Sequence, residues 1–473
     1  MASVQTAAEI VKRLQGAGFE TYLAGGCVRD RLLGRAPADY DIATAATPGE
    51  VRALFPRTVE VGAAFGVIRV LADDGEYEVA TFRTEGPYID GRHPASVRFA
   101  TAKEDVARRD FTINGLLYDP ETGRVIDDVG GREDLAARRI RTIGDPETRF
   151  AEDHLRMLRA VRLAAELGFD IDPDAAAAVR RLARRLAEVS PERIRDEIVR
   201  IVTGPDPGRA LGLLEDTGLL NAVLPEVAAE VGVPQPEEFH PEGDVFTHTR
   251  LALGALRAPS ATLAMATLLH DIGKPPTLIR ADRIRFSHHD EVGAAMARVV
   301  MERLRFPRRE TDRVVFLVGR HMVFKDIRQM RGAKVRRLMA EEAFPELLEL
   351  HRADSAASHK DFSIYEWVRA FLDRLAGEPP LPPPLITGHD VMALGLAPGP
   401  RVGQVLRGVE NARLDGEIRT RDEALELARR LAGAQREASV GRASRTPTRH
   451  PRRGGTPRPQ GDGRGNAAAE GEV

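Results

Sequence analysis

Two aspartates placed two residues apart, Asp39 and Asp41, are the residues of this chain best suited to metal-dependent chemistry. They follow a glycine pair, Gly25 and Gly26, and an arginine, Arg29. On a β-strand, side chains two residues apart project from one face, so both carboxylates could hold divalent cations, which prefer oxygen ligands. An Asp-x-Asp sequence alone is common in solvated turns. Glycines that let backbone N–H groups approach phosphate favour instead a site for two-metal phosphoryl transfer.

Other polar residues in the first 145 positions could complete such a site. Glu78, in a β-rich run, is a candidate third carboxylate, although an exposed strand glutamate explains it nearly as well. Arg108 and Arg109 can offer forked donors to a triphosphate, and Asn114 can fix a sugar or a backbone group. The alternative for the arginine pair is a solvated helix face.

A helical segment that starts at Glu152 carries a second set of recognition residues. Asp153 and Arg156 are three apart, so on one helix they would share a face, where an acceptor and a forked donor can meet the edge of one base. Arg159 and Arg162 continue the same side. An ordinary ion pair between positions i and i+3 is the alternative for Asp153 and Arg156.

The elements expected around these residues give an α+β head followed by an all-α remainder. Short β-rich runs bounded by Gly, Pro or Asp occupy Glu20–Ala24, Asp39–Ala43, Thr58–Val61, Gly66–Leu71 and Tyr77–Phe82. Helical periodicity dominates from Phe150, and the last helix is expected from Arg421 to about Ala432. The predicted domains are a head over 1–145, a neck and body over 146–232, a metal-dependent domain over 233–377, a helical tail over 378–436, and a disordered Arg-, Gly- and Pro-rich end over 437–473.

Composition excludes several classes of protein. The 473 residues carry a net charge of -2, so no overall basic field indicates a nucleic-acid partner, and 42% of them are hydrophobic, as in ordinary globular proteins. The single cysteine, Cys27, excludes a disulfide within the chain and fits a reducing cytoplasm. The longest apolar run, Ala261–Leu269, is far shorter than the ~20 residues of a membrane span. We therefore expect a soluble, cytoplasmic protein without a membrane partner.

Three segments of the first 230 residues, GGCVRDRLLGR with DYD, RRDFTIN, and EDHLRMLRAVRLAAELGF, resemble the successive signatures of the class II tRNA nucleotidyltransferase and bacterial poly(A) polymerase family. The best match is to its CCA-adding members. This resemblance implies an enzyme that adds CMP and AMP from CTP and ATP to the tRNA 3′ end without a template, with Mg²⁺ held by Asp39 and Asp41. It also implies a set of nucleotide-binding residues: Gly26, Arg29, Arg109, Asp153, Arg156, Arg159 and Arg162.

The nucleotide specificity stays open at this point. The loop Phe82–Phe99, with its Asp90-Gly91-Arg92 run, resembles the flexible element of CCA-adding and A-adding members and argues for A addition. The alternatives are an A-only or a CC-only tRNA nucleotidyltransferase, a poly(A) polymerase, and a hydrolase whose head only binds RNA. Oligomeric state, monomer or homodimer, is also open.

Histidines and aspartates between 236 and 358 have the order and spacing of the HD metal-dependent phosphohydrolase superfamily. The core positions are His248, His270, Asp271 and Asp354, and the extra positions of its two-metal members are His289 and His321. Imidazole with carboxylate suits Mn, Fe, Ni, Co or Zn. The resemblance implies a second activity on phosphate esters, as a cyclic phosphodiesterase, 2′-nucleotidase or phosphatase. His288 and His351 are expected to be structural.

Overall fold

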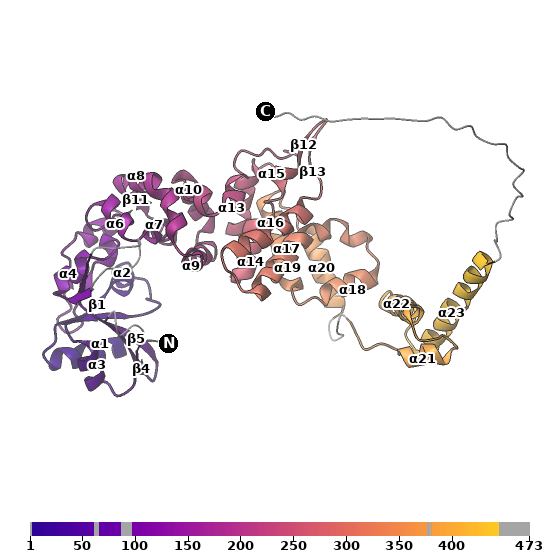
Figure 1. The fold of residues 1–473 in the computed structure, drawn as a ribbon, viewed down its shortest axis with the longest axis horizontal. Coiled ribbons are helices and arrows are strands. Elements are labelled where there is room, and N and C mark those ends of the chain that lie inside the picture. Colours follow the sequence, from indigo (N-terminus) through magenta and orange to yellow (C-terminus); the bar gives the residue numbers. More distant parts are fainter. Residues whose placement is uncertain (1, 61–65, 87–96, 376–378, 380, 444–473) are drawn as a thin grey trace, which may run out of the picture. The chain divides into compact units, whose positions relative to one another are not determined.

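A computed structural model describes residues 2–60, 66–86, 97–375, 379 and 381–443 (Figure 1). The chain divides into two compact units, Met1–Met330 with Leu338–Glu378, and Arg331–Arg337 with Pro379–Val473. No helix among the described residues is both long and apolar enough to cross a bilayer. The run Asp90-Gly91-Arg92 lies outside the described residues.

A mixed sheet forms the centre of the head. Its strand order over the described residues is β3-β4-β5-β2-β1-β8-β9. The bounds are β1 Thr21–Ala24, β2 Asp41–Thr44, β3 Thr58–Glu60, β4 Val67–Ala72, β5 Gly75–Thr81, β8 Leu117–Tyr118 and β9 Val125–Ile126. Strand β2 pairs antiparallel with β1 and parallel with β5, so both of its neighbours can bring residues beside it. A separate pair joins β6 Arg83–Glu85 to β7 Val97–Phe99.

Helices of the head cover this sheet and connect its strands. Helix α1 (Val4–Gly16) is amphipathic, with Ile10, Val11 and Leu14 buried, and the Ser3 side chain caps its first turn. The remaining helical elements of the head are α2 Gly26–Leu32, α3 Pro48–Leu54, α4 Ala102–Ala107, η2 Thr112–Asn114 and α5 Gly131–Ala136. Helix α2 starts directly after β1, which places its first turn at the edge of the sheet where β2 begins.

A helical neck and body follow the head. Their elements are α6 Pro146–Glu152, α7 Leu155–Leu167, α8 Pro173–Leu182, η3 Ala183–Glu188, α9 Pro191–Val202, α10 Pro207–Asp216, α11 Leu219–Val223 and α12 Pro225–Ala228. Most of α7 is buried, and Gly168 ends it in the left-handed conformation that favours glycine. The short strands β10 (Arg139–Ile140) and β11 (Asp170–Ile171) pair in parallel, which ties the end of the head to the end of α7.

The next region is helical except for one hairpin, β12 Leu278–Arg280 with β13 Ile284–Phe286. Its helical elements are α13 Val245–Ala255, α14 Ala261–Leu269, α15 Lys274–Thr277, α16 His289–Arg303, α17 Arg308–Arg320, η4 His321–Gln329, α18 Gly332–Met339, α19 Phe344–Ala357 and α20 Ser363–Arg374. Helix α14 is apolar nearly all round and is buried from Leu263 to Leu269. An α+β head followed by helices confirms the predicted fold class, and the two short β-pairs are additions to it.

The second unit contains α21 Gly388–Ala393, α22 Pro400–Leu414 and α23 Arg421–Ala443, together with the part of α18 that lies within Arg331–Arg337. Helices α21, α22 and α23 share a core that includes Val391, Val405, Val409 and Ala424. Helix α23 continues well past the expected end near Ala432, so the first residues of the end that we expected to be disordered are helical. Residues 444–473 lie outside the described part.

Candidate active sites

The glycine pair shapes the backbone of the head site. Gly25 has φ 74° and ψ −134°, a conformation that favours glycine. A Cβ atom at this position would lie 3.2 Å from Arg109 Nη1 and 3.6 Å from Asp41 Oδ2. Gly25 therefore gives the turn into α2 its conformation and leaves room for a cation and a carboxylate to approach the backbone.

Strand pairing brings Asp41 beside Glu78. Asp41 is the first residue of β2, and its partners are Ala24 on β1 and Glu78 on β5. Paired residues on neighbouring strands point to the same face, so Asp41 and Glu78 form a carboxylate pair. Both residues are exposed.

Asp39 is not on the strand, which corrects the prediction that Asp39 and Asp41 are two residues apart on one face. Asp39 lies in a bend before β2. Strand β1 ends opposite Asp41 and turns into α2 at Gly25, and the pairing of β2 with β5 also begins only at Asp41, opposite Glu78, so neither neighbouring strand pairs with Asp39. The acidic character of the site thus comes from a bend residue and two neighbouring strands.

The charge of this acidic group is visible in the pKa of Asp41. Its pKa rises to about 6 because the surrounding protein partly desolvates the carboxylate and because Asp39 and Glu78 repel its charge, whereas Arg109 opposes the rise. Asp41 is nevertheless exposed, so a solvated cation can reach it. These carboxylates repel one another, and a divalent cation bound between them would remove that repulsion.

The head carboxylates suit Mg²⁺ bound together with a nucleotide. Among the residues that the structure describes, groups of three side chains with ligand atoms within 4.8 Å of one another occur around histidines of the helical region, and Asp39, Asp41 and Glu78 do not form one. Mg²⁺ typically takes one or two protein carboxylates and completes its shell with water and substrate phosphates. The donor set therefore fits that ion, and a triphosphate would supply the missing oxygens.

A chain of buried hydrogen bonds runs from the glycine turn to the neck. Arg29 Nη1 donates to Asn114 Oδ1 at 2.9 Å, and Asn114 Nδ2 donates to Asp110 Oδ1 at 3.1 Å. The other oxygen of Asp110 accepts Nη2 and Nε of Arg159, on α7, at 2.7 and 2.9 Å. Arg29, Asp110 and Asn114 are each less than a tenth exposed. Burial alone would raise the pKa of Asp110, but the charge of Arg159 and the bond from Asn114 lower it to about 2.

Arg109 faces the same site from a different anchor. Its Nη2 lies 3.0 Å from Oδ2 of Asp105, which is buried and also binds Arg108. Its Nη1 lies 3.4 Å from the main-chain oxygen of Asn114. Two arginines, Arg29 and Arg109, thus lie at the glycine turn, each fixed by an aspartate or an amide, as recognition of a triphosphate requires.

Asp153 and Arg156 do not share a helix face, which corrects the second prediction. Helix α6 ends at Glu152 and α7 begins at Leu155, and Asp153 lies between them with φ −146°. Its carboxylate accepts the backbone N–H of Leu155 and pairs with Arg193 at 2.7 Å. Arg156 pairs instead with Glu152 at 2.5 Å. An aspartate whose carboxylate accepts the free N–H groups at the start of a helix lies just before that helix and not within it. The spacing of Asp153 and Arg156 alone does not show this.

The remaining neck arginines point to different partners. Arg159 reaches back to Asp110 in the head, whereas Arg162 pairs with Glu197 on α9 at 2.5 Å and with Glu166 at 2.9 Å. Each of the two arginines is held by a carboxylate, and the expectation that both continue one nucleotide-facing side stays a prediction.

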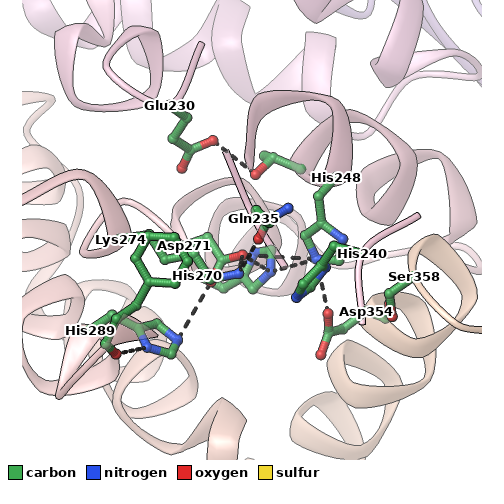
Figure 2. Close-up of polar contacts among 12 residues, drawn as sticks. Glu230, Gln235, His240, His248, His270, Asp271, Lys274, His289, Asp354 and Ser358 are labelled. Carbon is green, nitrogen blue, oxygen red and sulfur yellow. Dashed lines mark hydrogen bonds and ion pairs between the residues drawn. The ribbon is translucent and has the colours of Figure 1, made fainter. Parts of the chain in front are cut away.

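The six predicted ligands of the helical region converge in one cluster. Figure 2 shows His248, His270, Asp271, His289 and Asp354 of this cluster. The six ligands form two groups with ligand atoms within 4.8 Å of one another: His248, His270 and Asp354, and Asp271, His289 and His321. Asp271 lies between the groups, with Oδ2 3.3 Å from His270 Nε2 and Oδ1 3.6 Å from His289 Nε2. Such an arrangement suits two cations that share a bridging carboxylate.

The tautomers of the histidines fit a metal cluster. Nδ1 of His270, His289 and His321 each lies within 2.9 Å of a main-chain carbonyl, which fixes the proton on Nδ1. The Nε2 lone pairs then face inward, and those of His289 and His321 are 3.2 Å apart. Burial lowers the pKa of His321 to about 4, so its imidazole is neutral. Facing lone pairs repel each other, and a shared cation removes that repulsion.

Several residues near this cluster were missed from the sequence. Lys274 Nζ lies 2.7 Å from Asp271 Oδ2 and 2.6 Å from Gln235 Oε1, and Glu242 Oε1 accepts from Nδ1 of both His248 and His240. Lys274 is three residues after Asp271, so its position in the sequence could have indicated a contact with that carboxylate. Gln235 lies far from any ligand in the sequence and offers no such signal. As predicted, His288 and His351 lie outside both groups; His288 is exposed, and His351 stacks on Phe324.

Three family models match the chain in the same order as these features. They are the poly A polymerase head domain over residues 21–141, the probable RNA and SrmB-binding site of polymerase A over 168–231, and the HD domain over 244–358. An A-adding tRNA nucleotidyltransferase of Deinococcus radiodurans is 37% identical over 432 residues, which are 87% of this chain and 95% of that protein. The chain belongs to the tRNA nucleotidyltransferase and poly(A) polymerase family. A match of this length places the head, the neck and the histidine cluster in one family architecture.

Other family relatives match the first half most strongly. A CCA-adding enzyme of Geobacillus stearothermophilus is 48% identical over 227 residues, 48% of this chain and 56% of that protein, so the match spans about half of its length. The crystal structure of a Bacillus stearothermophilus CCA-adding enzyme in complex with CTP superposes with a TM-score of 0.73 at 30% identity, over 92% of this chain and 98% of that one. The family membership predicted from the head and neck motifs is confirmed.

Proposed function

We propose that the head adds CMP and AMP from CTP and ATP to the 3′ end of tRNA, as a CCA-adding enzyme. The observation that carries this proposal is the meeting of Gly25, Asp41, Glu78 and Arg109 at the start of β2, within a chain that resembles CCA-adding enzymes over its sequence and fold. Divalent-metal chemistry on a nucleoside triphosphate uses this combination of acidic and guanidinium groups.

The contacts support a separate proposed role for the carboxylates and for the arginines. Asp39 and Asp41, with Glu78 beside them, would hold Mg²⁺, which when bound lowers the barrier for attack of the RNA 3′ hydroxyl on the α-phosphate with loss of pyrophosphate. Arg29 and Arg109, fixed by Asn114 and Asp105, bind the triphosphate. The N–H groups at the start of α2 face the same anion.

Base selection is the proposed role of Asp153 and Arg156 in the neck. Their present partners are Arg193 and Glu152, so reading a base requires these ion pairs to open or to share their charged groups with the base edge. The side chains of these pairs are 10–25% exposed, and Arg156 also donates to main-chain oxygens of Arg149 and Arg108, so the contacts made by the nucleotide must offset the cost of the exchange. We further propose that residues 146–232 and the tail over 378–436 bind the tRNA, and that the reaction takes place in the cytoplasm.

An A-adding enzyme is the second candidate, because the D. radiodurans relative that matches 95% of its own length carries that name. One assay separates the candidates: labelled CTP and ATP are offered with tRNAs that end before, within and after the CC sequence. CCA addition predicts incorporation on all tRNAs that lack the terminal A, whereas an A-only enzyme ignores a tRNA without CC and a CC-only enzyme stops before A. A poly(A) polymerase would extend unrelated RNA in long runs.

The histidine–aspartate cluster is proposed to hydrolyse phosphate esters with divalent transition metals such as Mn, Ni, Co, Fe or Zn. Two groups of nitrogen and oxygen ligands bridged by Asp271 support this proposal. The test is release of phosphate from 2′,3′-cyclic and 2′-phosphorylated nucleosides with each metal. Loss of this activity in His270→Ala with Asp271→Ala, while nucleotide addition persists, would support two separate sites. Persistence of the only activity in an Asp39→Ala, Asp41→Ala double variant would favour a hydrolase with an inactive head.

A further inference from the structure

One ligand histidine of the cluster differs from the others in the group that its Nδ1 contacts. His270, His289 and His321 have Nδ1 bonded to main-chain carbonyls of Thr267, Phe286 and Val318. His248 has Nδ1 2.6 Å from Oε1 of a side chain, Glu242 (Figure 2 shows the His248 and His240 rings). A side-chain partner can be changed by mutation without altering the main chain, so His248 is the one of these four whose orientation can be tested directly.

Glu242 is well placed to fix the tautomer of His248. Its side chain is only 6% exposed, and its other oxygen, Oε2, is buried without a hydrogen-bond partner among the described residues. Two residues later, Asp244 caps α13 through Thr247 and also accepts the N–H of Gly232, which holds this segment against the helix. The Glu242 carboxylate therefore contacts the imidazole nitrogens of His240 and His248 from a segment that the hydrogen bonds of Asp244 fix in place.

The opposite nitrogen of His248 faces the first ligand group. Its Nε2 lies 2.9 Å from Asp354 Oδ1 and 3.3 Å from Nε2 of His270. For Nε2 to bind a cation, the imidazole must be neutral with its proton on Nδ1, and a carboxylate that accepts this proton's hydrogen bond also raises the basicity of the ligand.

We propose that Glu242 is a positioning residue for this cluster, which holds His248 as a ligand of the first group and thereby sets the affinity of that metal position alone. The proposal rests on the cluster being a metal site, as put forward under the proposed function. The second group, Asp271, His289 and His321, has no contact with Glu242 among the described residues, so its affinity is expected to stay unchanged.

His240 provides an internal control. Its Nδ1 lies 2.9 Å from the same Glu242 oxygen, and its ring meets the His248 ring edge-on at 5.0 Å. His240, Glu242 and His248 also lie close enough to form a third ligand group. If Glu242 acts through His248, removal of His240 leaves both metal positions intact, whereas a metal held by His240 itself would be lost.

The experiment titrates the metal-free full-length protein with Co²⁺ in excess Mg²⁺, which occupies the head site, and follows binding by calorimetry, cobalt absorption and metal content after gel filtration. Wild type is expected to bind two Co²⁺ ions in the cluster. Glu242→Gln, which keeps the size of the side chain, is expected to weaken one ion by about 10- to 100-fold and to leave the other unchanged. His240→Ala and Glu238→Gln, an exposed glutamate of the same segment, are expected to bind as wild type does.

Equal Co²⁺ affinities in Glu242→Gln and wild type would overturn the proposal, as would weakening of both ions or loss of an ion in His240→Ala. A circular-dichroism melt shows whether the variant is folded, and Glu242→Asp, which retains a carboxylate, should recover part of the lost affinity. The readout does not depend on catalysis. A wild-type protein that binds two ions but hydrolyses no phosphate ester would refute the proposed hydrolase and leave the role of Glu242 standing.

Discussion

Replacing Asp110 by Asn should damage both stability and nucleotide addition, because this one carboxylate joins the head to the neck. Asp110 binds Arg159 on α7 through one oxygen and Asn114 through the other, and Asn114 in turn holds Arg29 at the glycine turn. The substitution keeps the shape of the side chain and removes its charge. Arg159 then loses its charged partner, and the Asn114 amide loses the acceptor that orients it toward Arg29.

The magnitude follows from the burial of the pair. Breaking a buried ion pair from one side costs about 3–5 kcal/mol. The Arg159 side chain is 34% exposed, so water partly replaces the lost partner. The expected loss in the free energy of unfolding is therefore about 3 kcal/mol, at the low end of this range. The lowered pKa of Asp110 gives a similar figure for all of its contacts together: a fall from 3.8 to about 2 corresponds to roughly 2–3 kcal/mol. Because this pKa is depressed, the stabilisation is present above pH ~4 and is lost as pH falls from about 4 to about 2.

The assay has two parts. Urea unfolding of Asp110→Asn, wild type and the exposed control Asp128→Asn at neutral pH and near pH 3 measures the stability difference, which should shrink at the lower pH. Incorporation of CTP and ATP into tRNA measures catalysis, and kcat should fall for both nucleotides since Arg29 serves both. A loss below about 0.5 kcal/mol, or one that does not shrink near pH 3, would refute the assignment of this buried pair as a link between head and neck.

Four further predictions test the sites. Asp39→Asn and Asp41→Asn should each abolish incorporation of CTP and ATP while changing the melting temperature little, since both residues are exposed; a large drop in melting temperature would contradict a purely functional role. Mg²⁺-dependent incorporation should fall as pH drops below about 6, because protons compete with the cation for Asp41, and a flat profile from pH 7 to 5 would contradict this. Gly25→Ala should lower activity and cost more than about 1 kcal/mol in urea unfolding, because Gly25 has a positive φ and its added Cβ would press on Arg109; Gly34→Ala, with a positive φ but open space, should cost stability without loss of activity. Metal removal by a chelator should lower the melting temperature of wild type more than that of His289→Ala, and equal shifts would argue against bound metal at the second group.

Part of the head site could be predicted because the glycine turn and Asp41 lie next to a strand end, so residue type and spacing were enough to select them. The six cluster ligands of the helical region were selected by their resemblance to the HD superfamily in order and spacing. Asp39 was misplaced because a strand exists only where a neighbour pairs with it, and the pairing of β2 with both β1 and β5 begins at Asp41, two residues after Asp39. Spacing within the sequence does not show where such pairing begins.

The partners of charged residues could not be read in the same way. Asp153 is satisfied by Arg193, forty positions later, and Asp110 by Arg159, forty-nine positions later, so each pairing depends on how helices of the neck meet the head. A buried carboxylate must find a partner, but sequence spacing predicts partners only within one helix turn or across one hairpin. Glu242 lies six residues before His248, a spacing that predicts no contact, and the role proposed for it depends on the turn of the chain that brings its oxygen to Nδ1 of His248. Residues that hold ligands in place are therefore the part of an active site that needs the structure, whereas the ligands themselves can be found without it.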